Sequence, residues 1–141
     1  MQPGTTINYA FCPPTSGKHY NIQGQAPLRR GFYGPDAGLR PGNWVHNLEH
    51  GHVVFAYRGT PDQATLDAIR QTWENTPGGP LAASCGVPNS VIVVRMDDMY
   101  TSFAALAWDR ALLMDEWDSE QAMAFAAQWQ DNPQAPEHVC P

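Results

Sequence analysis

Short apolar runs dominate the middle of the chain. Val53 to Tyr57 contains no charged side chain, and the run stops at Arg58 and Gly59. Ser90 to Met96 holds a second run, in which Val91 to Val94 is entirely apolar and β-branched. Runs of this length and composition are typical of buried strands, so the pattern predicts one strand in each segment.

Helical spacing of apolar residues follows the first run. Thr60 and Gln63 have the spacing of a capping box, and Pro61 occupies the first helical position. The apolar face that follows is formed by Leu66, Ile69 and Trp73. The pattern predicts a helix that ends at Thr76 to Gly79, where proline and glycine interrupt it.

Two further elements are predicted after the second strand. Phe103 to Met114 fits a helix or a strand pair by pattern alone, and the acidic pairs that flank it favour a hairpin whose second strand is Leu106 to Leu113. Asp118 and Gln121 cap a last helix, which stops at Asn132 to Pro133. Its apolar face is formed by Ala122, Phe125, Ala126 and Trp129. This order of elements predicts an α+β fold, with a small mostly antiparallel sheet and two helices packed on one face.

The first 51 residues contain no sustained helical or strand periodicity, because proline or glycine interrupts the backbone every few residues. Aromatic residues are frequent there, which favours an ordered wrap against the core over a floppy linker. They are Tyr9, Phe11, Tyr20, Phe32, Tyr33 and Trp44. We therefore expect a single domain over residues 1–141, with a long irregular N-terminal segment (1–51), an α+β core (52–132) and a tail (133–141).

Net charge and the length of the apolar runs exclude some classes of binding partner. The 14 acidic and 8 basic side chains give a net charge of −6, which disfavours nucleic acid and anionic membranes. The longest apolar runs are strand-sized, well below the ~20 residues of a membrane-spanning helix, so we expect no transmembrane segment.

Three widely spaced cysteines, Cys12, Cys85 and Cys140, include no Cys-x-x-Cys pair. One disulfide plus one free thiol is the natural arrangement, and the sequence leaves all three pairings open. Such a bridge would indicate an oxidising compartment outside the cytoplasm, whereas three reduced thiols would fit the cytoplasm.

Residue types that bind metals concentrate in one short peptide. His46 and His50 are four residues apart, so in a helical turn both imidazoles project from one face and can reach one ion. Gly51 would then reverse the chain into the strand, which leaves His52 beside this pair or pointing away from it. Glu49 is expected to orient a ligand. The alternative is that these histidines are surface residues or hydrogen-bonded braces.

A further ligand is expected from outside this peptide. His19 is the first choice, His138 in the tail is the second, and His52, Met96 and Cys12 are weaker candidates. A histidine site suits copper or zinc, and Cu²⁺ binds a given nitrogen site more tightly than Zn²⁺. We therefore expect a copper ion, with zinc as the alternative.

The same peptide matches His-x-x-Glu-His, the inverted zinc-protease motif. Such proteases carry this motif within a long helix, whereas Gly51 and the strand at Val53 end the helix at once. We therefore set the protease interpretation aside.

Several motifs together form a signature. They are Pro13-Pro14-Thr15-Ser16-Gly17 with His19, Gly31-Phe32-Tyr33, Val45-His46-Asn47-Leu48-Glu49-His50-Gly51 with Val53-Val54 and Tyr57, and Ala107-Trp108. From about Tyr9 to Glu137 the chain resembles the bacterial domain-of-unknown-function 3105 family. The resemblance implies functional roles for His19, His46, Glu49 and His50, and it implies export or membrane anchoring. The family's closing Pro-Glu corresponds to Pro136-Glu137, and Asp109 stands where the family usually has glycine.

Three functional classes remain open. The first is an extracytoplasmic domain that binds, carries or senses copper through the histidine cluster, with a membrane-anchored or extracytoplasmic protein as its partner. The second is a small mononuclear metalloenzyme, oxidative or hydrolytic, with an open coordination position and Glu49 as acid or base. The third is a metal-free interaction module with an exposed apolar patch. We favour the first.

Overall fold

The computed structural model describes residues 5–141, which form a four-stranded mixed sheet with helices on both faces. The strands are β1 (Val53–Tyr57), β2 (Val91–Arg95), β3 (Phe103–Ala107) and β4 (Arg110–Met114), and the helices are α1 (Pro41–Glu49), α2 (Gln63–Asn75), α3 (Ala82–Cys85) and α4 (Ser119–Trp129). The strand order is β2-β1-β3-β4, in which β1 and β2 are parallel and the other two pairs are antiparallel. The predicted α+β class with a mostly antiparallel sheet is confirmed.

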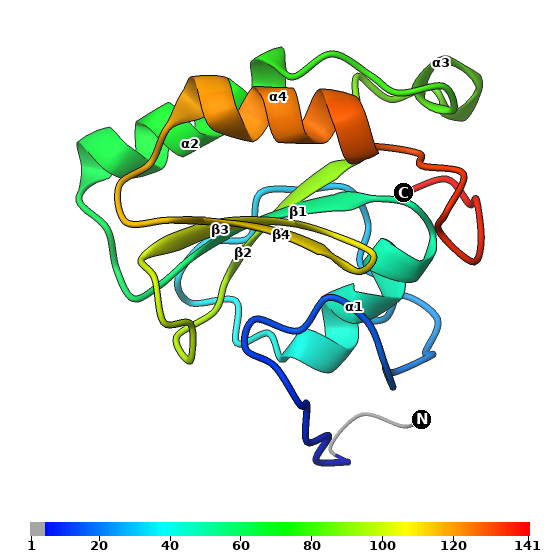
Figure 1. The fold of residues 1–141 in the computed structure, drawn as a ribbon, viewed down its shortest axis with the longest axis horizontal. Helices are drawn as coiled ribbons and strands as arrows, with labels where there is room; N and C mark the ends of the chain where they lie inside the picture. Colours follow the sequence, from blue (N-terminus) through cyan, green and yellow to red (C-terminus); the bar gives the residue numbers. More distant parts are fainter. Residues whose placement is uncertain (1–4) are drawn as a thin grey trace.

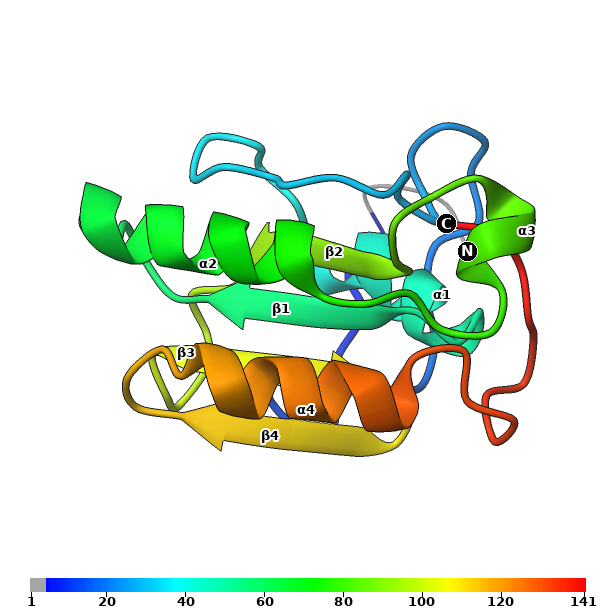
Figure 2. The same ribbon diagram turned by 90° about the horizontal axis from the view of Figure 1, so that it is seen from above.

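Alternating side chains of the strands divide the core into two layers. Phe55 and Tyr57 of β1 face α2 and α4, which lie together on one side of the sheet (Figures 1 and 2). Val54 and Ala56 point to the opposite side, where α1 and the N-terminal segment cover them. The prediction of two helices on one face is therefore confirmed, but a third helix covers the other face.

Helix α1 corrects the prediction that residues 1–51 are irregular throughout. Pro41 occupies its first turn, and the Asn43 side chain accepts a hydrogen bond from the Arg40 backbone N–H. Trp44, Val45 and Leu48 are fully buried against the sheet. A nine-residue helix offers too few apolar turns for periodicity to be visible in the sequence, so tertiary burial, rather than local pattern, stabilises it.

The end of α1 is a Schellman motif that turns the chain into β1. The Gly51 N–H donates to the Leu48 carbonyl and the His52 N–H donates to the Asn47 carbonyl. Gly51 adopts a φ of +87°, which glycine accepts without strain. The expected reversal at Gly51 is confirmed, and it places the start of β1 three residues after His50, the C-cap of the helix.

Two boundaries differ from the sequence prediction. Helix α2 begins at Gln63 because the Asp62 side chain caps it by accepting from the Thr65 N–H, so the predicted capping box at Thr60 is wrong. The hairpin turns at residues 108–109, so Leu106 belongs to β3 and not to the second strand. Asp109 lies at this turn with a φ of +59°, a conformation that the short polar side chain of aspartate tolerates. The short helix α3 was not predicted.

The last helix and the chain end agree with the prediction. Asp118 caps α4 by accepting from the Gln121 N–H. Cys85 and Cys140 form a disulfide, and Cys12 is a free, exposed thiol. The expected count of one bridge and one thiol is thus confirmed. Over residues 5–141, none of the helices combines the length and the apolar character that a membrane span needs.

Replacing Gly51 by alanine is expected to destabilise the fold by about 1–2 kcal/mol, because a side chain disfavours the left-handed conformation. The added Cβ would also lie 3.4 Å from the Asp131 Cα. Urea unfolding measures the loss. Gly34→Ala is the matched control, since a Cβ there meets nothing within 4 Å and should change stability little. Equal stability of the two variants would contradict the role of Gly51.

Candidate metal centre

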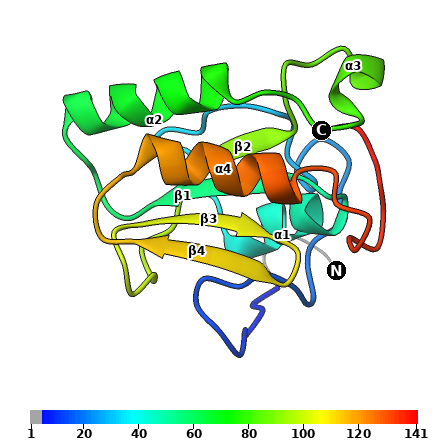
Figure 3. The same ribbon diagram turned by 45° about the horizontal axis from the view of Figure 1, so that its top comes forward.

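The polar face of α1 lies opposite the face that packs on the sheet. Glu49 and His50 lie three and four residues after His46, so the three side chains share one side of the helix. The N-terminal segment contacts this side at His46 and Glu49, and the C-terminal segment contacts it at His50. Segments from both ends of the chain therefore meet at this side of α1, and Figure 3 shows both segments running close to the helix.

His46 is 6% exposed and is oriented by the backbone of the N-terminal segment. Its Nδ1 lies 2.7 Å from the Tyr20 carbonyl oxygen. Because a carbonyl only accepts, Nδ1 carries the proton, which leaves Nε2 of the neutral ring with a free lone pair. This is the arrangement by which proteins fix the tautomer of a metal-binding histidine.

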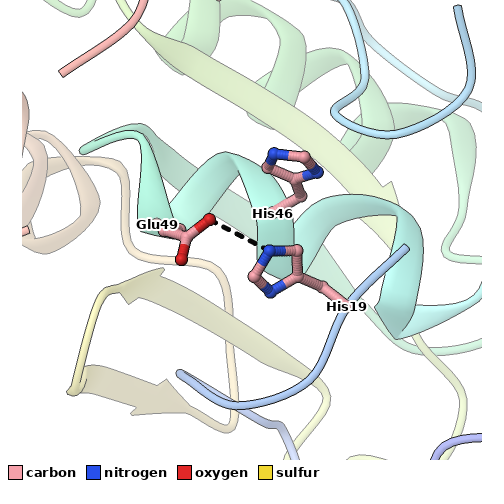
Figure 4. Close-up of side chains that lie close together, drawn as sticks. All are labelled: His19, His46 and Glu49. Carbon is pink, nitrogen blue, oxygen red and sulfur yellow. Dashed lines mark ion pairs between the residues drawn. The ribbon is translucent and has the colours of Figure 1, made fainter. Parts of the chain in front are cut away.

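His19 approaches the same place from the N-terminal segment. Its Nδ1 lies 2.9 Å from the Gly17 carbonyl oxygen, and its Nε2 lies 3.0 Å from Glu49 Oε2. The rings of His19 and His46 are 4.5 Å apart between centroids. Figure 4 shows the two imidazoles and the Glu49 carboxylate gathered beside α1. Both ring nitrogens of His19 therefore face oxygen atoms, one of a carbonyl and one of a carboxylate.

The three side chains form a group with the dimensions of a metal site. One ligand atom from each of His19, His46 and Glu49 lies within 4.8 Å of the other two. Two imidazoles and a carboxylate are a common donor set for zinc and for other divalent transition ions. We call this group the first triad. It brings together two of the three predicted ligands, and it makes Glu49 a direct ligand candidate instead of an orienting residue.

His50 lies in a second group that shares only Glu49 with the first triad. Glu49, His50 and Glu137 each offer a ligand atom within 4.8 Å of the others. We call this group the second triad. His50 Nε2 lies 3.0 Å from Glu137 Oε2, although the rings of His46 and His50 are neighbours, 4.6 Å apart. Glu137 was not predicted as a ligand from the sequence. Its only distinguishing feature there is that it is an acidic residue directly after a proline near the end of the chain.

His52 is a structural brace. Its Nε2 donates to the Val139 carbonyl at 2.6 Å, and its Nδ1 accepts from the Asn47 amide at 3.2 Å. Asn47 also pairs with both backbone groups of Leu28, so this amide links α1 to the N-terminal segment. Both ring nitrogens of His52 are used in these bonds, which leaves none for an ion.

The environment of the helix disfavours protonated imidazole. Burial is the main cause that lowers the pKa of His46 and of His50, and the neighbouring histidine lowers each further. Burial also lowers the pKa of His52 to about 4. Because an imidazole must be neutral to bind a metal ion, the lowered values favour the form of His46 and His50 that can coordinate.

The remaining candidates lie outside both triads. His138 is exposed and its Nε2 lies 2.9 Å from the Asn132 carbonyl oxygen. Met96 is buried in the core beside α1, and the Cys12 thiol donates to the Asp98 carbonyl. The soft sulfur ligands considered for copper are therefore not part of either group.

The fold and this cluster define a small α+β domain with a histidine and carboxylate site between a helix and both ends of the chain. The family model described as "Protein of unknown function (DUF3105)" matches residues 1–141, the whole chain. The chain belongs to this family, as the motifs indicated. The searches of curated proteins and of solved structures gave no match.

The metal-free protein is expected to lose stability as the pH falls from about 6.5 to about 4. The His52 pKa is about 4 in the folded protein, against 6.5 for an ordinary histidine side chain in the unfolded chain. The unfolded chain therefore binds more protons in this window, and folding loses about 3 kcal/mol across it. Urea unfolding at several pH values, with a chelator present, measures the slope.

His52→Gln is the variant that tests the assignment of this slope. Glutamine does not titrate, so its stability should fall less steeply over the same window than that of the wild type. His138→Gln is the control, because His138 is exposed and should leave the slope as it is. Parallel slopes for the wild type and His52→Gln would contradict the assignment.

Proposed function

We propose that this protein is an extracytoplasmic domain that binds a divalent transition metal ion through His19, His46 and Glu49. The observation that carries the proposal is the convergence of these three donors within 4.8 Å, from segments 27 or more positions apart in the chain. The orientation of each imidazole by a backbone carbonyl supports it, because metal-binding histidines are commonly held in this way. The disulfide supports a location in an oxidising compartment.

Copper is the ion that we propose, with zinc as the alternative. Cu²⁺ exceeds Zn²⁺ in affinity for a given set of nitrogen and oxygen donors. The first triad contains no sulfur, so the proposal concerns Cu²⁺ and not Cu⁺. An imidazole must be neutral to bind an ion, so metal uptake should be weaker at low pH.

A mononuclear metalloenzyme is the second candidate. Catalytic zinc sites typically have three protein ligands and keep a further coordination position for water or substrate. The positions of the larger cavities argue for binding instead. One cavity of about 520 Å³ is lined by residues between 6 and 18. Another of about 540 Å³ is lined by residues of 34–41 and 95–98. No member of either triad lines these two cavities.

A metal-free interaction module is supported least. It would make the histidines hydrogen-bonded braces, as His52 is. His50 does not fit this role, because its Nδ1 is buried and has no hydrogen-bond partner among the described residues. A brace of this kind would leave a polar atom unsatisfied in the core, at a cost of about 1–3 kcal/mol.

The proposal predicts the response of metal affinity to single substitutions. Cu²⁺ and Zn²⁺ affinities are measured by competition with a chelator, using protein without an affinity tag. His46→Ala should weaken the tightest binding step about 100-fold or more, because it removes a direct ligand. His138→Ala is the matched control, since it removes an exposed histidine outside both triads, and its affinity should stay within about twofold of the wild type.

The order of the two metals tests the identity of the ion. Tighter binding of Cu²⁺ than Zn²⁺ agrees with the proposal, and metal-loaded protein can then be assayed for oxidative and hydrolytic activity. Wild-type protein that takes up neither ion, or His46→Ala protein that titrates as the wild type does, would overturn it.

A further inference from the structure

The second triad has no role in the mononuclear site proposed above. Its ligand candidates are Glu49, His50 and Glu137, which come from the end of α1 and from the C-terminal segment. Glu49 belongs to both triads, and a carboxylate has two oxygens that can bind two different ions. The two triads are therefore adjacent and joined through one side chain.

Glu137 is held in place although its side chain is 53% exposed. Its backbone N–H donates to the Glu49 carbonyl at 3.0 Å, which fixes the C-terminal segment against the end of α1. Two residues later the Val139 carbonyl accepts from His52, and Cys140 is bonded to Cys85. A terminal segment without such ties would fray, so the structure presents Glu137 to His50 in a defined position.

The surroundings of His50 are those of a ligand and not of a brace. His50 is 5% exposed, and its only side-chain partner among the described residues is the Glu137 carboxylate at 3.0 Å. His52, two positions on, is also buried, but both of its ring nitrogens are hydrogen-bonded to protein groups. His50 Nδ1 thus has no hydrogen-bond partner among the described residues, while Nε2 of the same ring faces the Glu137 carboxylate.

The distances fit coordination as well as hydrogen bonding. Two atoms that each lie about 2.1 Å from one ion are about 3.0–3.4 Å apart at octahedral or tetrahedral angles. The distance between His50 Nε2 and Glu137 Oε2 is 3.0 Å, and that between His19 Nε2 and Glu49 Oε2 is also 3.0 Å. Each pair can therefore become two neighbouring ligands of one ion with little movement.

We propose that the site holds two divalent metal ions bridged by Glu49. His19 and His46 complete the first subsite, and His50 and Glu137 complete the second. This inference rests on the proposed metal-binding function and extends it from one ion to two. The second subsite has one imidazole and two carboxylates, so it takes an ion that accepts oxygen donors readily, such as Zn²⁺.

Metal stoichiometry tests the inference. Metal-depleted full-length protein is titrated with Zn²⁺ in a calorimeter, and the zinc retained after gel filtration is measured by elemental analysis. Wild-type protein should bind two equivalents. Glu137→Gln should lose the second equivalent or bind it about tenfold or more weakly, because the amide is a poor ligand for zinc. Glu116→Gln is the matched control, since Glu116 is exposed and outside both triads, and it should still bind two.

Electron paramagnetic resonance of the wild type loaded with two equivalents of Cu²⁺ gives a test that needs no variant. Ions bridged by one carboxylate lie about 3.5–4 Å apart in two-metal sites and should give a coupled spectrum. One equivalent in wild type and Glu137→Gln alike, or an isolated Cu²⁺ signal from the doubly loaded wild type, would overturn the two-ion site and leave the proposed function standing. Loss of the only equivalent in Glu137→Gln would also overturn it, by making Glu137 a ligand of a single ion. Wild-type protein that binds no metal would overturn the proposed function itself.

Discussion

The burial of one side of α1 is the constraint on which the site depends. Trp44, Val45 and Leu48 are fully buried against the sheet, so the helix cannot rotate without exposing them to water. Burying side chains of this size contributes about 1.5–3 kcal/mol each. The helical period then turns the His46 and Glu49 side chains toward the N-terminal segment, which contacts both of them. The candidate ligands are thus positioned by the packing of other side chains of the same helix.

Much of the fold could be predicted because its elements carry local signals. The apolar runs at Val53–Tyr57 and Val91–Arg95 are strands, and the cap at Asp118 begins α4. The predicted start of α2 was wrong because Thr60 and Gln63 have the spacing of a capping box, whereas the N-cap is Asp62, whose side chain accepts a hydrogen bond from the Thr65 N–H. Only the last turn of helix α1 was considered from the sequence, because the helix is stabilised by burial, and burial is set by residues that are distant in the sequence.

The site was predictable where spacing within one helix determines it, and not where distant segments meet. His46, His50 and His19 were all candidates, and the structure places all three at the cluster. The division into two triads follows from Glu137, which reaches His50 only because the C-terminal segment is tied to Glu49 and Cys85. Nothing in the local sequence around residue 137 encodes those contacts.

Anomalous X-ray diffraction from crystals of the Cu²⁺-loaded protein tests the central claim most directly, because it locates the ion and its ligands together. We predict an anomalous peak at the copper edge about 2.0–2.2 Å from a nitrogen of His19, a nitrogen of His46 and an oxygen of Glu49. The contact between His19 and Glu49, now 3.0 Å, would then be spanned by the ion. A peak at His138 alone, or none at α1 while His19 still donates to Glu49, would contradict the claim.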